Sequence, residues 1–275
     1  MKKTASFFLY LMLFPSSYFS LSAQHPQAKV VRSWPVHLSR QAVATDQHYL
    51  YVINNTNIQK YRKSDGTMVR SWHDPDSILH HMNSGIILNG KLYTCHSNYP
   101  ASPMASSVEI FDTATLQHIG SHSFGIMYGS ATWLDRKDNH WYVVFAHYTG
   151  KGSEPGKDNH WTRMVRFDNE WRATGSWIFP EKLIQEFGTR SNSGGVILDN
   201  GLILCTGHDN YKIYVLTFPG KGYTLQWIGT IPVGSYGQGI AYEKTSRGEF
   251  VYGIIKKEKR VIKTKIDTSP FLRSP

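Results

Sequence analysis

Three histidines occupy equivalent places in a repeating sequence. His96, His147 and His208 lie near the ends of three similar segments, which read LYTCHSN, VVFAHY and LCTGHD. A neutral imidazole ring offers one lone pair to a metal ion or a proton, and its pKa lies near neutrality. Three such rings with an open fourth position form a candidate site for Zn²⁺, Mn²⁺, Fe²⁺ or Ca²⁺, with Gln238 or His81 as an additional ligand.

The sequence leaves three interpretations of these histidines open. They could hold a metal, they could contact a ligand or transfer protons without a metal, or they could form hydrogen bonds between repeats. No local motif such as HExxH decides between these roles. His96, His147 and His208 are therefore candidate catalytic residues, and together with Gln238 they are candidate metal ligands.

The repeats that carry these histidines predict a β-propeller. Each contains short segments that are rich in β-branched and aromatic residues and bounded by turn residues, which is typical of strands. Repeats of about 40 to 55 residues with four strands each must stack on their neighbours to bury their apolar faces, as propeller blades do. The innermost segments are rich in small residues and begin at residues 40, 82, 128, 192 and 236. We find five repeats and no residues for a sixth.

The last repeat lacks an outer strand, and the start of the chain supplies one. The outer segment at residues 67–72 reads TMVRSW, and KVVRSWPV at residues 29–36 closely resembles it. The fifth repeat ends at Ile266 without such a segment. Pairing of the N-terminal strand with the last blade would remove exposed sheet edges. The predicted fold is therefore all-β: a five-bladed β-propeller of four-stranded antiparallel blades, with the last blade closed by the N-terminal strand.

Three additions to the repeats are expected around one mouth of the propeller. Residues 97–106 and 147–161 lengthen two loops, and residues 179–188 read as a short helix with Pro180 in its first turn and Gly188 at its end. Long loops on a rigid scaffold commonly form binding sites. The candidate ligand-binding residues at this mouth are His80, His81, Ser84, Asn98, Tyr99, Tyr128, Tyr148, Asn192 and Gln238.

The first residues predict export. Lys2 and Lys3 precede an apolar run from Phe7 to Phe14, and a candidate cleavage point follows Ala23. This pattern is typical of a secretory signal peptide, and the run is too short for a stable membrane anchor. We assign residues 1–23 to a signal peptide and residues 24–275 to a single propeller domain that is periplasmic or secreted, without stable membrane insertion. The sequence does not indicate the oligomeric state.

The net charge of the chain limits which kinds of partner are expected. The formal net charge is +10, and removal of Lys2 and Lys3 leaves +8. The sequence holds no nucleic-acid motif and no run of about five or six basic residues, so a nucleic acid is not an expected partner. The basic cluster KKEKR at residues 256–260 is interpreted as a solvated hairpin. The positive net charge of the chain favours an anionic small-molecule ligand.

Some charged residues near the predicted mouth have a simpler interpretation than catalysis. Asp209 could orient the ring of His208, but strand neighbours point to opposite faces, so we interpret Asp209 as a turn residue. Arg163 and Arg190 could meet a carboxylate, although a surface charge is the simpler interpretation of each. Carboxylates are scarce near the rim, which argues against the two-carboxylate mechanism of glycosidases.

The two cysteines of the chain are expected to be free thiols. Cys95 and Cys205 lie in corresponding strands of two blades that are not neighbours. Their Cα atoms should therefore be farther apart than the roughly 7 Å that a disulfide spans. We expect both thiols to be buried and reduced.

Six segments carry a resemblance to known proteins: HHMNSG (80–85), CHSNYP (95–100), YGSATW (128–133), SNSGG (191–195), TGHD (206–209) and GQGIAY (237–242). On these segments the chain resembles exported bacterial β-propeller proteins of the YVTN or quinoprotein-like type, some of them labelled cycloisomerase-like. Most are uncharacterised, so the resemblance implies a fold and no established chemistry. The mouth is also similar in residue types, but not in motif, to the metal site of propeller-type oligogalacturonate lyases.

These observations favour one function and leave two others open. The leading hypothesis is an exported propeller that binds a small polar ligand, anionic or derived from a sugar, at a histidine-lined mouth and acts on it as a lyase or isomerase. The alternative is a propeller without catalytic activity that binds a glycan or a partner protein at the same mouth. A purely structural scaffold is the third and weakest hypothesis.

Overall fold

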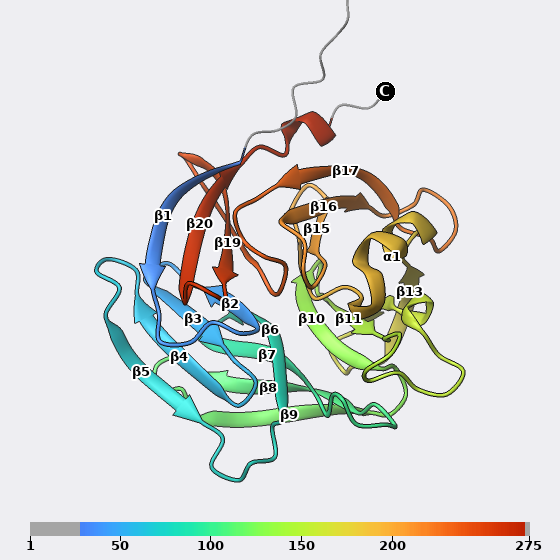
Figure 1. Ribbon diagram of the computed structural model, residues 1–275, viewed down its shortest axis with the longest axis horizontal. Coiled ribbons are helices and arrows are strands. Elements are labelled where there is room, and N and C mark those ends of the chain that lie inside the picture. The colour runs from blue at the N-terminus through green and yellow to red at the C-terminus, as the bar shows by residue number, and fades with distance from the viewer. Residues whose placement is uncertain (1–27, 273–275) are drawn as a thin grey trace, which may run out of the picture.

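Short segments with alternating apolar and polar residues pair into five separate sheets. The computed structural model describes residues 28–272, and its five sheets are arranged in a ring (Figure 1). Each sheet has four strands, and consecutive strands along the chain are antiparallel neighbours within it. The predicted five-bladed propeller is therefore confirmed.

The first three blades follow one another along the chain. The first consists of β2 (Ala42–Thr45), β3 (Tyr49–Ile53), β4 (Asn57–Arg62) and β5 (Met68–His73). The second consists of β6 (His81–Leu88), β7 (Lys91–Ser97), β8 (Ser106–Asp112) and β9 (His118–Gly125). The third consists of β10 (Ser130–Lys137), β11 (His140–Ala146), β12 (Arg163–Phe167) and β13 (Ala173–Ile178), with a 3-10 turn, η1 (Asn159–Trp161), before β12.

The last two blades complete the ring. The fourth consists of β14 (Gly194–Ile197), β15 (Ile203–Thr206), β16 (Lys212–Thr217) and β17 (Gln226–Pro232). The fifth combines β18 (Ala241–Thr245), β19 (Gly248–Ile255) and β20 (Arg260–Ile266) with the N-terminal strand β1 (Lys29–Pro35). A final 3-10 turn, η3 (Ser269–Phe271), follows β20.

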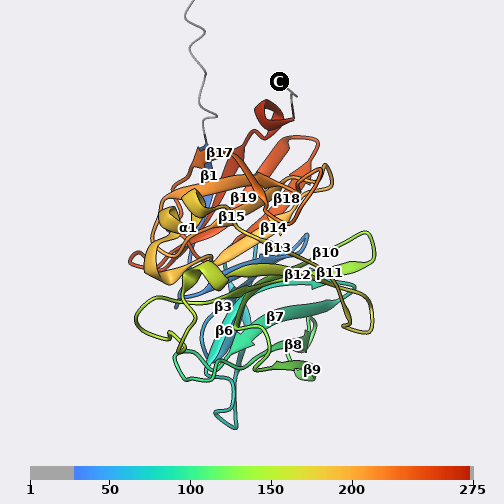
Figure 2. The ribbon, with the colours of Figure 1, turned by 90° about the vertical axis from the view of Figure 1, so that its right-hand side faces the viewer.

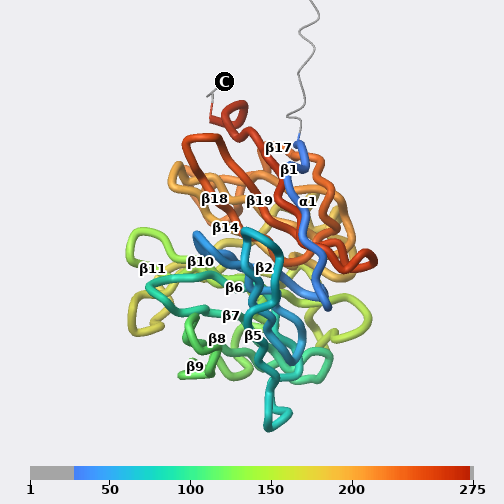
Figure 3. Tube along the Cα trace, turned by 90° about the vertical axis from the view of Figure 1, so that its left-hand side faces the viewer, coloured from blue at the N-terminus to red at the C-terminus, as the bar shows by residue number. Residues whose placement is uncertain are grey.

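Closure of the ring depends on the N-terminal strand, as the repeat pattern predicts. β1 runs antiparallel to β20, with Lys29 opposite Lys265 and Pro35 opposite Arg260. Figure 3 shows the blue N-terminal strand beside the red strands of the last blade. Trp34 is only 3% exposed, and its indole Nε1 donates a hydrogen bond of 2.9 Å to the carbonyl of Lys63 in the first blade.

Small residues allow the inner strands to crowd at the centre of the ring. A Cβ atom built on Gly239 would lie 2.0 Å from Ser84 Oγ and 2.4 Å from Ala42 Cβ, which belong to the second and first blades. No real side chain tolerates these distances, so glycine is required at this position. The small residues of the inner segments therefore set how closely the blades approach.

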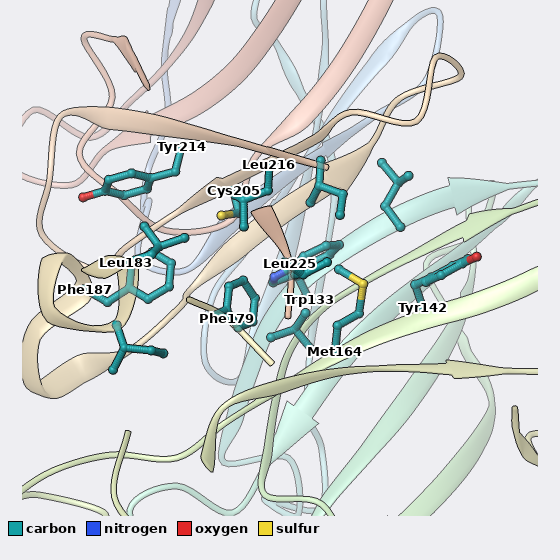
Figure 4. Packing of buried hydrophobic residues seen from close by; sticks show 14 residues of the cluster. Trp133, Tyr142, Met164, Phe179, Leu183, Phe187, Cys205, Tyr214, Leu216 and Leu225 are labelled. Carbon is teal, nitrogen blue, oxygen red and sulfur yellow. The ribbon is translucent and has the colours of Figure 1, made fainter. Parts of the chain in front are cut away.

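Apolar side chains fill the space between neighbouring blades. Trp133 of the third blade is fully buried against the fourth blade, and its Nε1 donates a hydrogen bond to Asn192 Oδ1. Figure 4 shows Trp133 with Phe179, Leu183 and Leu225 in this cluster. The helix α1 (Glu181–Phe187) contributes the buried residues Leu183, Ile184 and Phe187, so the crossover between these two blades forms part of the core.

The helix expected at residues 179–188 is present but shorter. α1 begins at Glu181, because Pro180 is its N-cap in an extended conformation and is not in its first turn. Gly188 ends the helix with a φ of 66°, and the 3-10 turn η2 (Gly188–Arg190) follows. Figure 2 gives a second view of α1 and the sheets from the side.

Two other sequence predictions concern thiols and membrane segments. Cys95 and Cys205 are both free and fully buried, as expected. Within residues 28–272, no helix has the length and apolar character needed to cross a membrane. The predicted signal peptide at residues 1–23 lies outside the described residues.

Trp34→Ala should destabilise the propeller strongly. The substitution removes a buried indole at the closure, including its hydrogen bond to Lys63 and its stacking on Tyr252 with ring centroids 6.0 Å apart. Truncation of a buried tryptophan costs about 3 to 5 kcal/mol, and the free energy of unfolding in denaturant measures the loss. Tyr223→Ala is the control, because Tyr223 is 76% exposed. Equal effects of the two substitutions would show that the closure contributes little stability.

Candidate functional site

All five blades contribute to one cavity at the mouth of the propeller. Its volume is about 670 Å³, and it is lined by Arg40, Gln41, Asn55, His81, Asn83, Tyr99, Thr132, Tyr148, Thr149, Gly150, Lys151, Thr189, Arg190, Ser193, His208 and Gln238. These residues come from the starts of inner strands, the ends of second strands, the two lengthened loops and the turn after α1. The two lengthened loops predicted at this mouth therefore line it, whereas the predicted helix at residues 179–188 contributes no lining residue and only the turn that follows it does.

The rim of the cavity is positively charged. Arg40, Lys151 and Arg190 are exposed lining residues, and His81 and His208 line the same cavity. No aspartate or glutamate is among the described residues that line the cavity. Because guanidinium and ammonium groups stay charged near neutrality, the cavity attracts anions.

His208 forms a hydrogen-bonded pair with Asp209. Its Nδ1 lies 2.5 Å from Asp209 Oδ1, and its Nε2 lies 3.2 Å from Nη1 of Arg190. Since the guanidinium can only donate, Nε2 carries the lone pair, and Nδ1 donates its proton to Asp209. This arrangement fixes the tautomer of His208 and directs its basic nitrogen toward Arg190.

Asp209 lies in a bend, in agreement with its interpretation as a turn residue, but the expectation that it does not orient His208 was wrong. The strand rule does not apply to this pair, because β15 ends at Thr206 and both residues lie in the bend that follows. Their side chains can therefore meet on the same side. Arg190 is not an isolated surface charge either, since its Nε lies 3.9 Å from Asp209 Oδ2.

Burial keeps the cavity histidines neutral. Burial, and then the neighbouring His96 and His208, lower the pKa of His81 to about 4. Burial also lowers the pKa of His208, and the positive charge of Lys256 acts in the same direction, while Asp209 opposes both. Near neutral pH, His208 is therefore neutral, and its Nε2 lone pair accepts the hydrogen bond from Arg190.

Three aromatic rings form one wall of the cavity. The ring of Tyr99 lies 5.0 Å from that of His81 and 4.9 Å from that of Tyr148, measured between centroids. Gly152 passes so close to Tyr99 that a Cβ atom would lie 2.4 Å from the ring, and its φ is 82°. The lengthened loop of the third blade can therefore cover this wall only with glycine at this position.

Gln238 holds the segment that carries His208. Its side-chain Nε2 donates to the carbonyl of His208 at 3.2 Å, and its backbone N donates to the carbonyl of Gly207 at 3.1 Å. Its own carbonyl accepts a hydrogen bond of 2.6 Å from Thr206 Oγ1. Gln238 is 2% exposed, so it lines the base of the cavity and positions the His208 segment.

His96 lies outside the cavity lining and positions the strand that carries His81. Its Nε2 accepts a hydrogen bond of 3.2 Å from the backbone N of His80, so its Nδ1 carries the proton, which it donates to Ser107 Oγ at 3.0 Å. Ser107 in turn donates to the buried carboxylate of Glu109 at 2.5 Å. Both ring nitrogens of His96 are therefore occupied.

His147 lies outside the cavity lining as well, beneath the lengthened loop of its blade. Its Nε2 lies 2.9 Å from the carbonyl of Tyr128, and its Nδ1 lies 3.2 Å from Oε2 of Glu154. Burial lowers the pKa of His147, and the carboxylate of Glu154 opposes this effect. Glu154 Oε1 also accepts from the backbone N of Met104 at 3.0 Å, so these contacts join the two lengthened loops.

The three histidines do not fit the expected metal site. Each has both ring nitrogens in contact with protein atoms, and among the described residues no hydrogen bond joins two of them. Within residues 28–272, no group of three or more histidine, cysteine, aspartate or glutamate side chains is arranged to hold a metal ion.

The other predicted ligand-binding residues have local roles. Asn192 is fully buried and donates from Nδ2 to the carbonyl of Thr206 at 2.8 Å, while Tyr128 stacks on Phe145 with centroids 4.8 Å apart. Asn98 shapes its loop by accepting from the backbone N of Ala105 at 2.8 Å. Of the nine predicted ligand-binding residues, His81, Tyr99, Tyr148 and Gln238 line the cavity, whereas His80, Ser84, Asn98, Tyr128 and Asn192 do not.

Sequence reasoning missed most of the positive charge. Arg40 precedes the first inner strand, and Lys151 lies in the lengthened loop of the third blade, so either could have been placed at the mouth from its position. Lys256 follows the second strand of the fifth blade, at the place where His147 follows that of the third. The interpretation of residues 256–260 as a solvated hairpin missed the equivalence of Lys256 and His147.

Comparisons with known proteins bear on the fold. No protein-family model matches the chain, and no curated protein matches its sequence. The glutaminyl cyclase of Myxococcus xanthus is 12% identical over 88% of this chain and 97% of its own, with a TM-score of 0.59. A luciferin-regenerating enzyme is 9% identical over 88% and 95% of the two chains, with a TM-score of 0.55. The PQQ-bound aldose sugar dehydrogenase of Streptomyces coelicolor is 11% identical over 88% and 98%, with a TM-score of 0.54. At these identities the similarity shows the propeller fold alone.

His81 and His160 should titrate at opposite ends of the histidine range. Hydrogen bonds to Glu181 and Asp158 raise the pKa of His160, whereas burial lowers that of His81 to about 4. As the pH falls from about 7 to about 5, His160 should be protonated and His81 should stay neutral. Ring NMR signals, assigned with His81→Gln and His160→Gln, measure both. Titration of His81 together with the exposed rings would contradict its burial in the cavity.

Proposed function

We propose that the cavity binds a small anionic ligand, such as a sugar acid, and that His208 moves a proton on it. The observation that carries this proposal is the charge of the cavity: two arginines and a lysine at the rim, two histidines within it, and no lining carboxylate in the described chain. A carboxylate ligand can form charge-assisted, bidentate hydrogen bonds with Arg40 or Arg190. Gln41, Asn55 and Asn83 offer hydrogen bonds to hydroxyl groups.

The proposed reaction begins with removal of the proton next to the ligand's carboxylate. When the carboxylate of the ligand takes over the hydrogen bond from Arg190, the lone pair on His208 Nε2 is free to accept this proton, and Asp209 stabilises the imidazolium that forms. The electron pair of the broken C–H bond moves into the carboxylate, where Arg40 and Arg190 offset the added charge. Expulsion of a group from the next carbon, which takes up a proton from water as it leaves, completes a lyase reaction. Delivery of a proton from water to the other face of the same carbon completes an isomerase reaction, and His208 then loses its proton to solvent.

Two features support an enzyme over a passive binding module. A histidine whose tautomer is fixed by a carboxylate is arranged for proton transfer, and simple binding of an anion does not need such a pair. Proteins named as a glutaminyl cyclase and as an aldose sugar dehydrogenase share the fold, so the scaffold accommodates enzymes. The noncatalytic alternative remains an outcome of the experiments below.

Arg40→Gln and Arg190→Gln should each weaken binding of galacturonate by about tenfold or more. Each removes a charge-assisted hydrogen bond worth about 1.5 to 3 kcal/mol. Isothermal titration calorimetry measures the dissociation constant, and added salt should weaken wild-type binding because the rim is exposed. Neutral galactose should bind more weakly than galacturonate. Arg247→Gln is the matched control, because Arg247 is exposed and does not line this cavity. Wild type that binds both sugars equally would contradict the anion site.

Asp209→Asn should lower the rate of proton removal without weakening binding. Loss of the carboxylate leaves His208 in the wrong tautomer and removes a fixed general base, which costs about 100- to 10,000-fold in kcat. Exchange of deuterium from D2O into the C5 position of galacturonate, followed by NMR, measures this step. Asp65→Asn is the control, because Asp65 pairs with Arg62 in an exposed turn. Binding without exchange in the wild type would identify the protein as a noncatalytic binding module.

A further inference from the structure

The first and fifth blades form a groove on the face of the propeller opposite the mouth. The two blades lie side by side and share a cluster of buried residues (Figure 1). Two hollows of about 440 and 570 Å³ adjoin in this groove, since Arg32, Glu243 and Lys263 line both. The turns after the inner strands β2 and β18 contribute to its lining, whereas the mouth is lined by residues where inner strands begin. The groove and the mouth therefore lie at opposite ends of the strands, and they have no lining residue in common.

The groove carries an excess of positive charge. Its two hollows are lined by six cationic side chains: Arg32, Arg62, Lys63, Arg247, Lys263 and Lys265. Among the described residues that line them, Glu243 is the one carboxylate, and it contacts both Lys63 and Lys263. Arg62 also pairs at 2.8 Å with Asp65, which does not line the groove. Arg32, Arg247 and Lys265 are exposed, so the groove attracts anions from solvent.

Buried aromatic rings hold cations of the groove in place. The guanidinium of Arg32 lies 4.9 Å from the ring centroid of Trp34, and its Nη2 donates a hydrogen bond of 2.6 Å to the carbonyl of Ser64 in the first blade. The amine of Lys263 lies 4.1 Å from the ring centroid of Phe250. Cations that are already ordered lose less conformational entropy on binding than mobile surface side chains do. The groove is therefore preorganised for an anion.

The same rings are not available for stacking on a ligand. The rings of Trp34, Phe250 and Tyr252 are buried. The remaining ring of the lining, that of Tyr49, has the amine of Lys60 over it at 4.0 Å. Single-stranded nucleic acids are commonly bound by stacking of their bases on aromatic side chains, and these four rings do not offer such a platform.

Neutral hydrogen-bonding groups accompany the cations instead. They are the amide and hydroxyl side chains of Gln47, Ser64, Thr245 and Ser246. Hydroxyl and amide groups can donate to and accept from the hydroxyl groups of a sugar, while the lysines and arginines bind acid groups. This combination suits a ligand that carries acid groups and hydroxyl groups along one chain.

We propose that the groove binds an acidic polysaccharide. One small anion can occupy one hollow, whereas a chain reaches cations in both, and linked contacts raise the overall affinity. Acid groups of the chain meet Arg32, Arg247 and Lys265, and its hydroxyl groups meet the neutral side chains. This inference goes beyond the proposed function, because the groove is separate from the mouth. Binding of a polymer at this face leaves the mouth free to take up a small ligand.

Dextran sulfate and dextran are matched probes, because they have the same sugar chain with and without acid groups. Isothermal titration calorimetry should detect binding of dextran sulfate, with an affinity that falls as salt is added, and no binding of dextran. The double variant Arg247→Gln/Lys265→Gln should weaken binding of dextran sulfate about tenfold, since each exposed charge contributes up to about fivefold.

Lys91→Gln/Lys221→Gln is the control for this variant. It removes the same charge from two exposed lysines that line neither the groove nor the mouth. Equal losses of affinity in the two double variants would show attraction by net charge alone and would overturn the inference. Single-stranded DNA of matched charge should bind more weakly than dextran sulfate, and equal binding of the two would overturn the assignment to a polysaccharide.

Variants of the mouth separate this inference from the proposed function. Arg40→Gln/Arg190→Gln should leave binding of dextran sulfate unchanged. Loss of that binding in the mouth variant, with full binding in Arg247→Gln/Lys265→Gln, would assign the polymer to the mouth and refute the groove. Absence of galacturonate binding to wild type, with dextran sulfate bound in the groove, would refute the proposed function and leave this inference intact.

Discussion

The pairing of β1 with β20 is the constraint on which the rest of the structure depends. The cavity has no single supporting element, because its lining residues come from all five blades. Their mutual positions are fixed only when the ring is closed, and the chain closes it with one strand from its N-terminal part. The buried Trp34 joins that strand to the first blade through Lys63. Distant residues such as Arg40, His81 and His208 thereby reach one mouth.

The three histidines at equivalent positions in the ring have different structural roles. His96 uses both nitrogens to hold the backbone of His80 and to bind Ser107, so it acts on the cavity only by positioning His81. His147 connects the carbonyl of Tyr128 to Glu154 and so anchors a loop. His208 alone of the three lines the cavity. A repeated residue type in a repeated fold therefore predicts a shared location better than it predicts a shared function.

The architecture could be predicted from the sequence because it depends on repeated local patterns. The similarity of residues 29–36 to residues 67–72 was enough to identify the closing strand, and small residues marked the inner strands. The individual contacts of the site were harder to predict, because they depend on where each strand ends. β15 ends at Thr206, so His208 and Asp209 lie outside the strand. Their side chains therefore need not point to opposite faces, as neighbouring side chains within a strand do. One or two residues of strand length decide whether these side chains meet.

The balance of charge links the fold to the proposed chemistry. Elsewhere in the molecule, one carboxylate neutralises two lysines: Lys63 and Lys263 both contact Glu243, and Tyr252 donates a hydrogen bond of 2.8 Å to the same carboxylate. At the mouth, by contrast, Arg40, Lys151 and Arg190 line a cavity that has no carboxylate among its described lining residues, and Asp209 contacts only Arg190 of these three, at 3.9 Å. Like charges gathered in a partly buried place destabilise the unliganded protein, and a bound anion relieves this repulsion.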